Sequence, residues 1–223
     1  QAHGIADEFL KLTLHVKGAG INIHDWRQSE SIVFNYIVAG SGPAHFGMGS
    51  DHRPIPEIGV VASAKRISES VGDALSKVEG VRLSSHAKMW WDSLGICWFA
   101  VQGQPDAMRN TVDALRHATG WKDLTMEEAI EIGERIVSAM RLVYQRRGFT
   151  KTDEMDYSPR YTEPAPAGPA QGRSINSYVP AMIDEYYRQM GWDVRTGRVL
   201  PETLERLGIA DLVEPREPAT VSR

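Results

Sequence analysis

The longest periodic segment of the chain lies past its middle and constrains the fold more than any other feature. Thr125 and Glu128 have capping-box spacing, in which the threonine oxygen accepts an amide N–H and the glutamate side chain returns to the cap. Apolar residues then recur at helical spacing as far as Val143, and Gly148 follows two arginines whose charge suits a helix C-terminus. We therefore predict a helix over 126–147.

Most of the remaining chain also has helical character. The sequence predicts further helices over 29–39, 60–78, 105–118, 179–190 and 201–207. Two short β-prone stretches flank the glycine-rich turn Lys17–Gly20, and this pattern predicts a hairpin over 12–23. The predicted fold class is therefore mainly α, with a short N-terminal β-hairpin.

A passage rich in proline and glycine, residues 151–173, divides the chain into regions. Proline lacks a backbone N–H, so we expect this passage to lie extended across the surface rather than in a helix or a central strand. Residues 1–150 are then a helical region that includes the hairpin. Residues 174–223 are expected to form C-terminal helices that pack on the same domain.

Composition limits the classes of function. The chain of 223 residues has a formal net charge of -4 and no lysine or arginine cluster beyond short pairs, so we do not expect nucleic acid as a partner. No apolar run approaches the roughly 18 residues that a membrane span needs, and no signal peptide is visible. A single cysteine fits a reducing compartment and an expected cytoplasmic location. No methionine precedes Met48, so we expect a fragment, a processed product or one part of a split protein.

The one cysteine, Cys97, ends the stretch DSLGIC, residues 92–97. Its sulfur could be a small buried hydrophobe, a nucleophile beside a base, or one ligand of a metal centre whose other ligands lie outside this chain. No CxxC or HExxH pattern accompanies it. Asp92 fits a helix N-cap, a carboxylate that accepts N–H bonds from a bound heterocycle, or both.

Two histidines, His45 and His52, lie in an irregular stretch rich in glycine and proline over 40–59. Either can be an ordinary exposed loop residue. Histidine is also the side chain best suited to proton transfer near neutral pH, so both are candidate acid–base groups.

Several stretches together resemble the aldehyde ferredoxin oxidoreductases, which are tungsten or molybdenum bis-pterin enzymes. DSLGIC resembles their DxxGLC motif, LHVKGAGINIHDWR at 14–27 resembles the hairpin that opens their C-terminal region, and GPAH at 42–45 resembles a glycine-rich stretch that ends in histidine. Four further matches follow in the family's order: ATGW at 118–121, GERIVSAMRLVYQRRGFT at 133–150, EPAPAGP at 163–169 and DEYYRQMGWDVRTG at 184–197.

The resemblance implies the C-terminal helical region of such an enzyme, with residues 1–150 facing the cofactors. Cys97 would be the fourth thiolate of a [4Fe–4S] cluster, and Asp92, Gly95 and Ile96 would contact the pterin. His45 would be the catalytic group that transfers a proton. The substrate would be an aldehyde or a related carbonyl or acyl compound, and electrons would pass to or from ferredoxin or another electron-transfer protein.

Both cofactors would also need an N-terminal pterin-binding domain or a partner subunit, so this chain alone is expected to be inactive. The sequence departs from the family pattern where Ile96 replaces a leucine and where HFGMGSDHRP follows the alanine of GPAH. The second departure leaves the substrate open and makes His52 an alternative base. The family also has a branch that contains the tungsten subunit of a benzoyl-CoA reductase, and membership of that branch is an alternative for this chain. A function of another class is a non-catalytic helical subunit or scaffold module that keeps the fold without cofactor.

Overall fold

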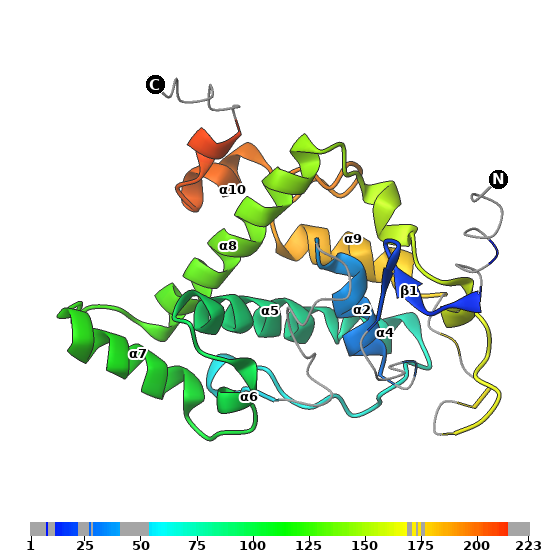
Figure 1. Cartoon of the computed structure of the whole chain (residues 1–223), viewed down its shortest axis with the longest axis horizontal. Coiled ribbons are helices and arrows are strands. Elements are labelled where there is room, and N and C mark those ends of the chain that lie inside the picture. Colours follow the sequence, from blue (N-terminus) through cyan, green and yellow to red (C-terminus); the bar gives the residue numbers. More distant parts are fainter. Residues whose placement is uncertain are drawn as a thin grey trace, which may run out of the picture.

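The computed structural model describes residues 12–21, 29–40, 54–168 and 177–213, together with residues 8, 27, 171, 172 and 174. The described chain is mainly helical, with one two-stranded hairpin near the N-terminus, as predicted (Figure 1). Among these residues, no helix combines the length and the apolar character that crossing a membrane requires.

The helix α5, Val78–Ser93, lies at the centre of the fold (Figure 1). It packs against α2, α8 and α9, and the short helix α6 follows it. All residues from Ser84 to Trp91 are buried, including several polar ones, so other elements cover α5 on every side over these two turns.

The helix α8, Met126–Arg146, has the predicted capping box between Thr125 and Glu128. It shares its largest interface with α5, and Gly133 lies directly against the backbone of α5. A Cβ atom on Gly133 would overlap the carbonyl oxygen of His86, so the absence of a side chain permits this close crossing.

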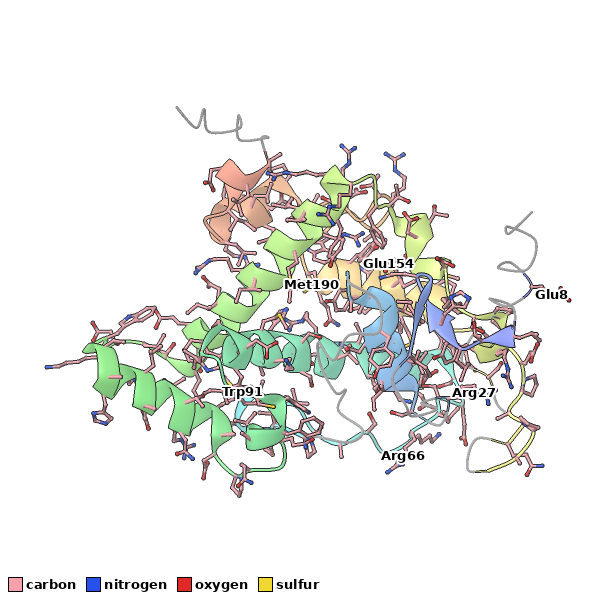
Figure 2. The ribbon with its side chains drawn as sticks, viewed as in Figure 1. Glu8, Arg27, Arg66, Trp91, Glu154 and Met190 are labelled. Carbon is pink, nitrogen blue, oxygen red and sulfur yellow. The ribbon has the colours of Figure 1, made fainter. Side chains whose placement is uncertain are left out.

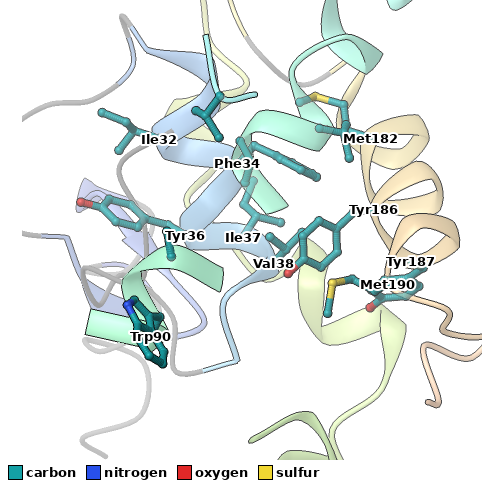
Figure 3. Packing of buried hydrophobic residues seen from close by; sticks show 14 of the residues in the cluster. Ile32, Phe34, Tyr36, Ile37, Val38, Trp90, Met182, Tyr186, Tyr187 and Met190 are labelled. Atoms are coloured by element: carbon teal, nitrogen blue, oxygen red, sulfur yellow. The ribbon is translucent and has the colours of Figure 1, made fainter. Parts of the chain in front are cut away.

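The helices α2, Glu30–Val38, and α9, Val179–Gln189, enclose one half of the core. Every residue of α2 is buried. Figure 3 shows apolar side chains of α2 and α9 pointing toward one another, and the rings of Phe34 and Tyr186 meet edge to face at 6.1 Å. The predicted helices over 29–39 and 179–190 are thus confirmed.

The predicted helix over 60–78 is wrong. Residues 61–70 are irregular and mostly exposed, and the short helix α4, Val71–Leu75, begins only at Ser70, whose hydroxyl accepts the Asp73 N–H at 3.1 Å. The apolar periodicity that suggested a single helix runs through this irregular, exposed chain, through α4 and into the start of α5. The cap at Ser70 fixes the start of α4 instead.

The remaining helices are shorter than α5 and α8. The helices α7, Ala107–Thr119, and α10, Pro201–Arg206, match their predicted segments, and Gly120 ends α7 in the left-handed conformation. The helix α6 is a single turn, Trp98–Val101. Short 3-10 helices lie at η2, Pro56–Ile58, and η5, Ala210–Leu212.

The hairpin pairs β1, His15–Val16, with β2, Ala19–Gly20, around a two-residue turn. Both turn residues have positive φ, 54° at Lys17 and 70° at Gly18, as a type I′ turn requires. The hairpin docks on the chain after α8, because Val16 pairs with Tyr157 and the Lys17 N–H donates to the Asp156 carbonyl.

The passage expected to be extended, 151–173, contains two 3-10 helices in its described part, η3 at Lys151–Met155 and η4 at Pro159–Tyr161. Tyr157 and Tyr161 are buried. This part of the passage is therefore docked on the domain, with one-turn helices where an extended chain was expected.

Candidate functional site

The sequence-predicted site residues other than histidine lie on one turn, Leu94–Cys97, called the Cys97 turn below, and on the last turn of α5 before it. The Gly95 N–H donates to the Asp92 carbonyl at 3.0 Å, and the Ile96 N–H donates to the Trp91 carbonyl at 2.9 Å. Gly95 has φ 72°. These two bonds and the left-handed glycine make a Schellman motif that ends α5.

This geometry corrects the interpretation of Asp92 as a helix N-cap. Asp92 lies in the last turn of α5, and the helix that follows it, α6, begins six residues later at Trp98. The Asp–Ser pair resembled a start signal, but Gly95 three residues on is the stop signal that governs the local structure.

Two tryptophans anchor the Cys97 turn at its ends. Trp91 and Trp98 are both buried, and their rings pack at a tilt with centroids 5.5 Å apart. The indole Nε1 of Trp91 also donates to Thr111 on α7 at 3.3 Å. The core therefore holds the turn through Trp91, labelled in Figure 2, and through Trp98, while Cys97 between them is exposed.

Cys97 is exposed, so the interpretation of its sulfur as a buried core atom is wrong. Its backbone is extended, with φ −64° and ψ 134°, and the thiol makes no cap hydrogen bond to α6. An exposed thiol on an anchored turn is available to a reagent, a metal or another polypeptide.

Gly95 leaves open space on the outer side of the same turn. An added Cβ atom would meet no other atom within 4 Å, yet the left-handed φ strains every residue with a side chain. The glycine therefore satisfies the turn geometry and also leaves the backbone accessible to a flat group that approaches it.

Asp92 carries an ion pair that the sequence analysis did not anticipate. Both of its carboxylate oxygens lie 2.5 Å from Nζ of Lys88, one helical turn earlier. The signal was present in the sequence, because residues four apart on a helix face each other.

The predicted acid–base group His45 and its alternative His52 lie outside the described residues. Within the described part, His86 is fully buried on α5, with Nε2 3.3 Å from Sδ of Met190. Burial, with a smaller contribution from Arg82 and Arg206, holds the pKa of His86 well below its usual value. His86 is therefore a neutral packing residue and not a proton donor to solvent.

The described residues fit an iron–sulfur cluster only in part. Such a cluster takes four thiolates, and the described residues contain no group of three or more histidine, cysteine or acidic residues that could hold a metal. One exposed thiol is what a chain that supplies a single ligand would present. Cys97 therefore fits the role of one ligand among four, with the others supplied from outside the described residues.

Comparison with known proteins identifies the family. The model of the aldehyde ferredoxin oxidoreductase family, domains 2 and 3, matches residues 4–209. This chain belongs to the aldehyde ferredoxin oxidoreductase family. The resemblance inferred from the DSLGIC stretch and its companions is thus confirmed, as is the mainly helical fold class.

Two curated relatives that cover most of this chain carry tungsten in their names. The chain is 30% identical over 203 residues to a tungsten-containing aldehyde ferredoxin oxidoreductase of Pyrococcus furiosus, a match that covers 90% of this chain and 31% of the relative. The corresponding protein of Thermococcus kodakarensis is 29% identical over 205 residues, with 91% and 32% covered. The chain therefore spans about a third of the length of these curated relatives.

Two other similarities extend the comparison. An aliphatic sulfonate oxidoreductase, WOR-like subunit, of Pyrococcus furiosus is 30% identical over 128 residues, which is 55% of this chain and 20% of that subunit. Among solved structures, the active-site complex BamBC of benzoyl coenzyme A reductase with 1,5-dienoyl-CoA has a TM-score of 0.51 at 19% identity, covering 65% of this chain and 20% of that chain. The structural match supports the fold alone.

Proposed function

We propose that this chain is the C-terminal part of a tungsten- or molybdenum-pterin, iron–sulfur oxidoreductase. The observation that carries the proposal is the exposed thiol of Cys97 on a rigid turn, in a chain whose family match spans residues 4–209. Residues 1–150 would face the cofactors. A preceding pterin-binding domain or a partner subunit would supply the other three thiolates, and this chain alone would be inactive.

The residues of the Cys97 turn have distinct roles in this proposal. Cys97 would bind one iron as thiolate, while Asp92 would accept N–H bonds from the pterin and the backbone of Gly95 and Ile96 would lie against it. The bound metal would supply two-electron chemistry and the cluster single-electron transfer. His45, or His52 in its place, would hold or move the substrate proton.

The anchoring of the turn gives these roles a physical basis. A ligand on a turn that is flanked by two packed tryptophans loses little conformational freedom when it binds iron. Exposure is equally necessary, because a thiol sealed in the core could not reach a cluster shared with another segment.

The substrate in this proposal is an aldehyde or a related carbonyl or acyl compound, and ferredoxin or a similar protein exchanges the electrons. The names of the aldehyde ferredoxin oxidoreductase relatives support this class, whereas the sulfonate oxidoreductase subunit shows that the family also includes other substrates. A cytoplasmic, reducing location fits a single unpaired cysteine. The alternative is a scaffold module without cofactor, and metal content separates the two.

The test is carried out on the intact protein that contains this chain, purified anaerobically from its source. We expect tungsten or molybdenum by elemental analysis and a reduced [4Fe–4S] signal by electron paramagnetic resonance. Cys97→Ala should remove or convert that signal and abolish turnover. The control Ala100→Ser changes an exposed residue three positions later and should leave both intact.

Two results would count against the proposal. An intact protein without metal or cluster would favour the scaffold alternative. A Cys97→Ala protein with normal cluster signal and normal turnover would show that the fourth ligand lies elsewhere.

A further inference from the structure

We propose that Lys88 is a positioning residue that aims the Asp92 carboxylate at the pterin. This inference rests on the proposed function, because it assumes that Asp92 faces the cofactor. Lys88 itself would not touch the pterin or the metal, so it is not a catalytic residue.

The geometry of the pair is the first support. Nζ of Lys88 lies 2.5 Å from each of the two carboxylate oxygens of Asp92, so the ammonium group bridges both oxygens. The two residues are four apart within α5, and the rigid helix backbone sets the separation of their Cβ atoms. The plane of the carboxylate is therefore fixed relative to the Cys97 turn that begins two residues later.

Burial distinguishes this pair from ordinary surface ion pairs. The side chain of Lys88 is only 11% exposed, whereas that of Asp92 is 41% exposed. The pair Lys65–Glu69 has the same spacing, but its side chains are 47% and 52% exposed. Side chains as exposed as these fix little geometry, because water screens the pair and holding two long side chains in place costs rotamer entropy.

Packing immobilises the lysine before any cofactor arrives. Lys88 lies within the continuously buried part of α5, where its aliphatic stem is covered and its ammonium group extends to the end of the helix. A buried ammonium needs a partner, and Asp92 supplies it. The lysine thus acts as a fixed cation that selects one orientation of an otherwise mobile carboxylate.

The orientation leaves acceptor capacity for a ring. A carboxylate has about four lone-pair sites on its two oxygens, and one bridging ammonium uses at most two of them. Because the Asp92 side chain is 41% exposed, a heterocycle with N–H groups could donate to the remaining sites. A pterin would then meet a carboxylate that needs no reorientation on binding.

The experiment measures retention of the pterin in the intact metal-loaded protein. Lys88→Met keeps the length and apolar stem but removes the charge, Lys88→Arg keeps the charge with a different shape, and Lys65→Met is the matched control at an exposed pair of equal spacing. After gel filtration, pterin is quantified by fluorescence following oxidation, together with metal content and the cluster signal. Circular dichroism confirms that each variant is folded.

We expect Lys88→Met to lose pterin at least tenfold faster than wild type with its cluster signal unchanged, and Lys88→Arg to lie between the two. Lys65→Met should behave as wild type. The double variant Lys88→Met with Asp92→Asn should be no worse than Asp92→Asn alone, because the lysine acts only through the carboxylate.

Other outcomes separate the failure of this inference from failure of the proposed function. Wild-type retention in Lys88→Met, or fully additive losses in the double variant, would overturn the role of Lys88 while leaving the enzyme assignment intact. If Lys88→Met does not fold, Lys88→Gln, which also removes the charge, decides, and wild-type retention in that variant overturns the inference. A wild-type protein without pterin would instead overturn the proposed function.

Discussion

Two regions of this molecule, one charged and buried and one largely apolar and exposed, differ in their physical character. Around Glu154 lies a buried group of charges, the Glu154 cluster, in which Oε1 accepts from Arg141 at 2.7 Å and from Tyr187 at 2.8 Å while Oε2 pairs with Lys17 at 2.7 Å. The Cys97 turn is exposed and is held by local backbone bonds and two tryptophans. Figure 2 shows Glu154 and Trp91 well apart, beside different helices.

The Glu154 cluster stabilises the fold, whereas the Cys97 turn presents a thiol that is available for binding. The Glu154 cluster joins the hairpin, α8, η3 and α9, so each of its charges holds together segments distant in sequence. Burial raises the pKa of the Tyr187 hydroxyl, with Glu154 adding to the effect, so that hydroxyl stays protonated and donates. The Cys97 thiol joins nothing in the described chain, which leaves it free to bind an external group.

The largest expected effect comes from Glu154→Ala. It leaves two buried cations without their anion, and breaking a buried pair typically costs about 3–5 kcal/mol. Guanidinium unfolding of the 223-residue chain measures the loss, with Glu69→Ala at an exposed pair as control. A loss below about 1 kcal/mol would contradict the structural role of the Glu154 cluster.

A smaller but still large effect is expected from Gly133→Ala, which tests the α5–α8 crossing that connects the two regions. The added methyl group would overlap the His86 carbonyl, a backbone atom that cannot rotate away. Overpacking of this kind costs about 1–3 kcal/mol. The control Gly72→Ala has only the Ser70 hydroxyl at 3.8 Å and should be neutral or mildly stabilising by urea unfolding.

A stability change of Gly133→Ala no larger than that of Gly72→Ala would show that the two helices can separate at no cost. That result would mean that α8, which carries Arg141, does not fix the position of α5 or of the Cys97 turn at its end.

Local signals in the sequence predicted much of the fold. The capping box at Thr125 and the glycine after α7 depend only on neighbouring residues, so their helices were placed within a residue or two. The helix α5 was missed because its polar residues, such as Ser84 and Lys88, are buried by other elements. Amphipathic periodicity fails for a helix that is covered on all sides.

The candidate site could be predicted in part for the same reason. Asp92, Gly95, Ile96 and Cys97 are close in sequence, so any local fold keeps them together, and the left-handed φ of Gly95 agrees with the glycine of the motif. The exposure of Cys97 depends on tertiary packing and could not be deduced from the apolar residues around it. Among these apolar residues, Trp91 and Trp98 are buried and Leu94 and Ile96 partly buried, whereas Phe99 is exposed.

The buried residue His86 should make the free energy of unfolding depend on pH. The expected effect is moderate and tests how the interior differs from the exposed Cys97 turn. The pKa of His86 is lowered in the folded chain, so below about pH 6.5 the unfolded state binds a proton that the folded state does not. Stability contributed by this residue is therefore complete above pH 6.5 and falls by up to about 1.4 kcal/mol per pH unit below it.

The measurement compares urea unfolding at pH 7.5 and pH 5.5 for wild type and His86→Gln. We expect wild type to lose about 1.4 kcal/mol more than the variant between these two values. Equal losses would mean that His86 becomes protonated in the folded chain, in conflict with its burial against Met190.

The smallest expected effect is the most informative for the comparison. Cys97→Ala should change the unfolding free energy of the 223-residue chain by no more than about 0.5 kcal/mol, because exposed positions without partners tolerate substitution. The backbone bonds of Gly95 and Ile96 and the Trp91–Trp98 contact do not involve the thiol. A cost of 2 kcal/mol or more, typical of a lost buried group, would mean that the sulfur stabilises the fold and that the two regions do not differ in this respect. A negligible cost would mean that the cysteine serves chemistry outside this chain.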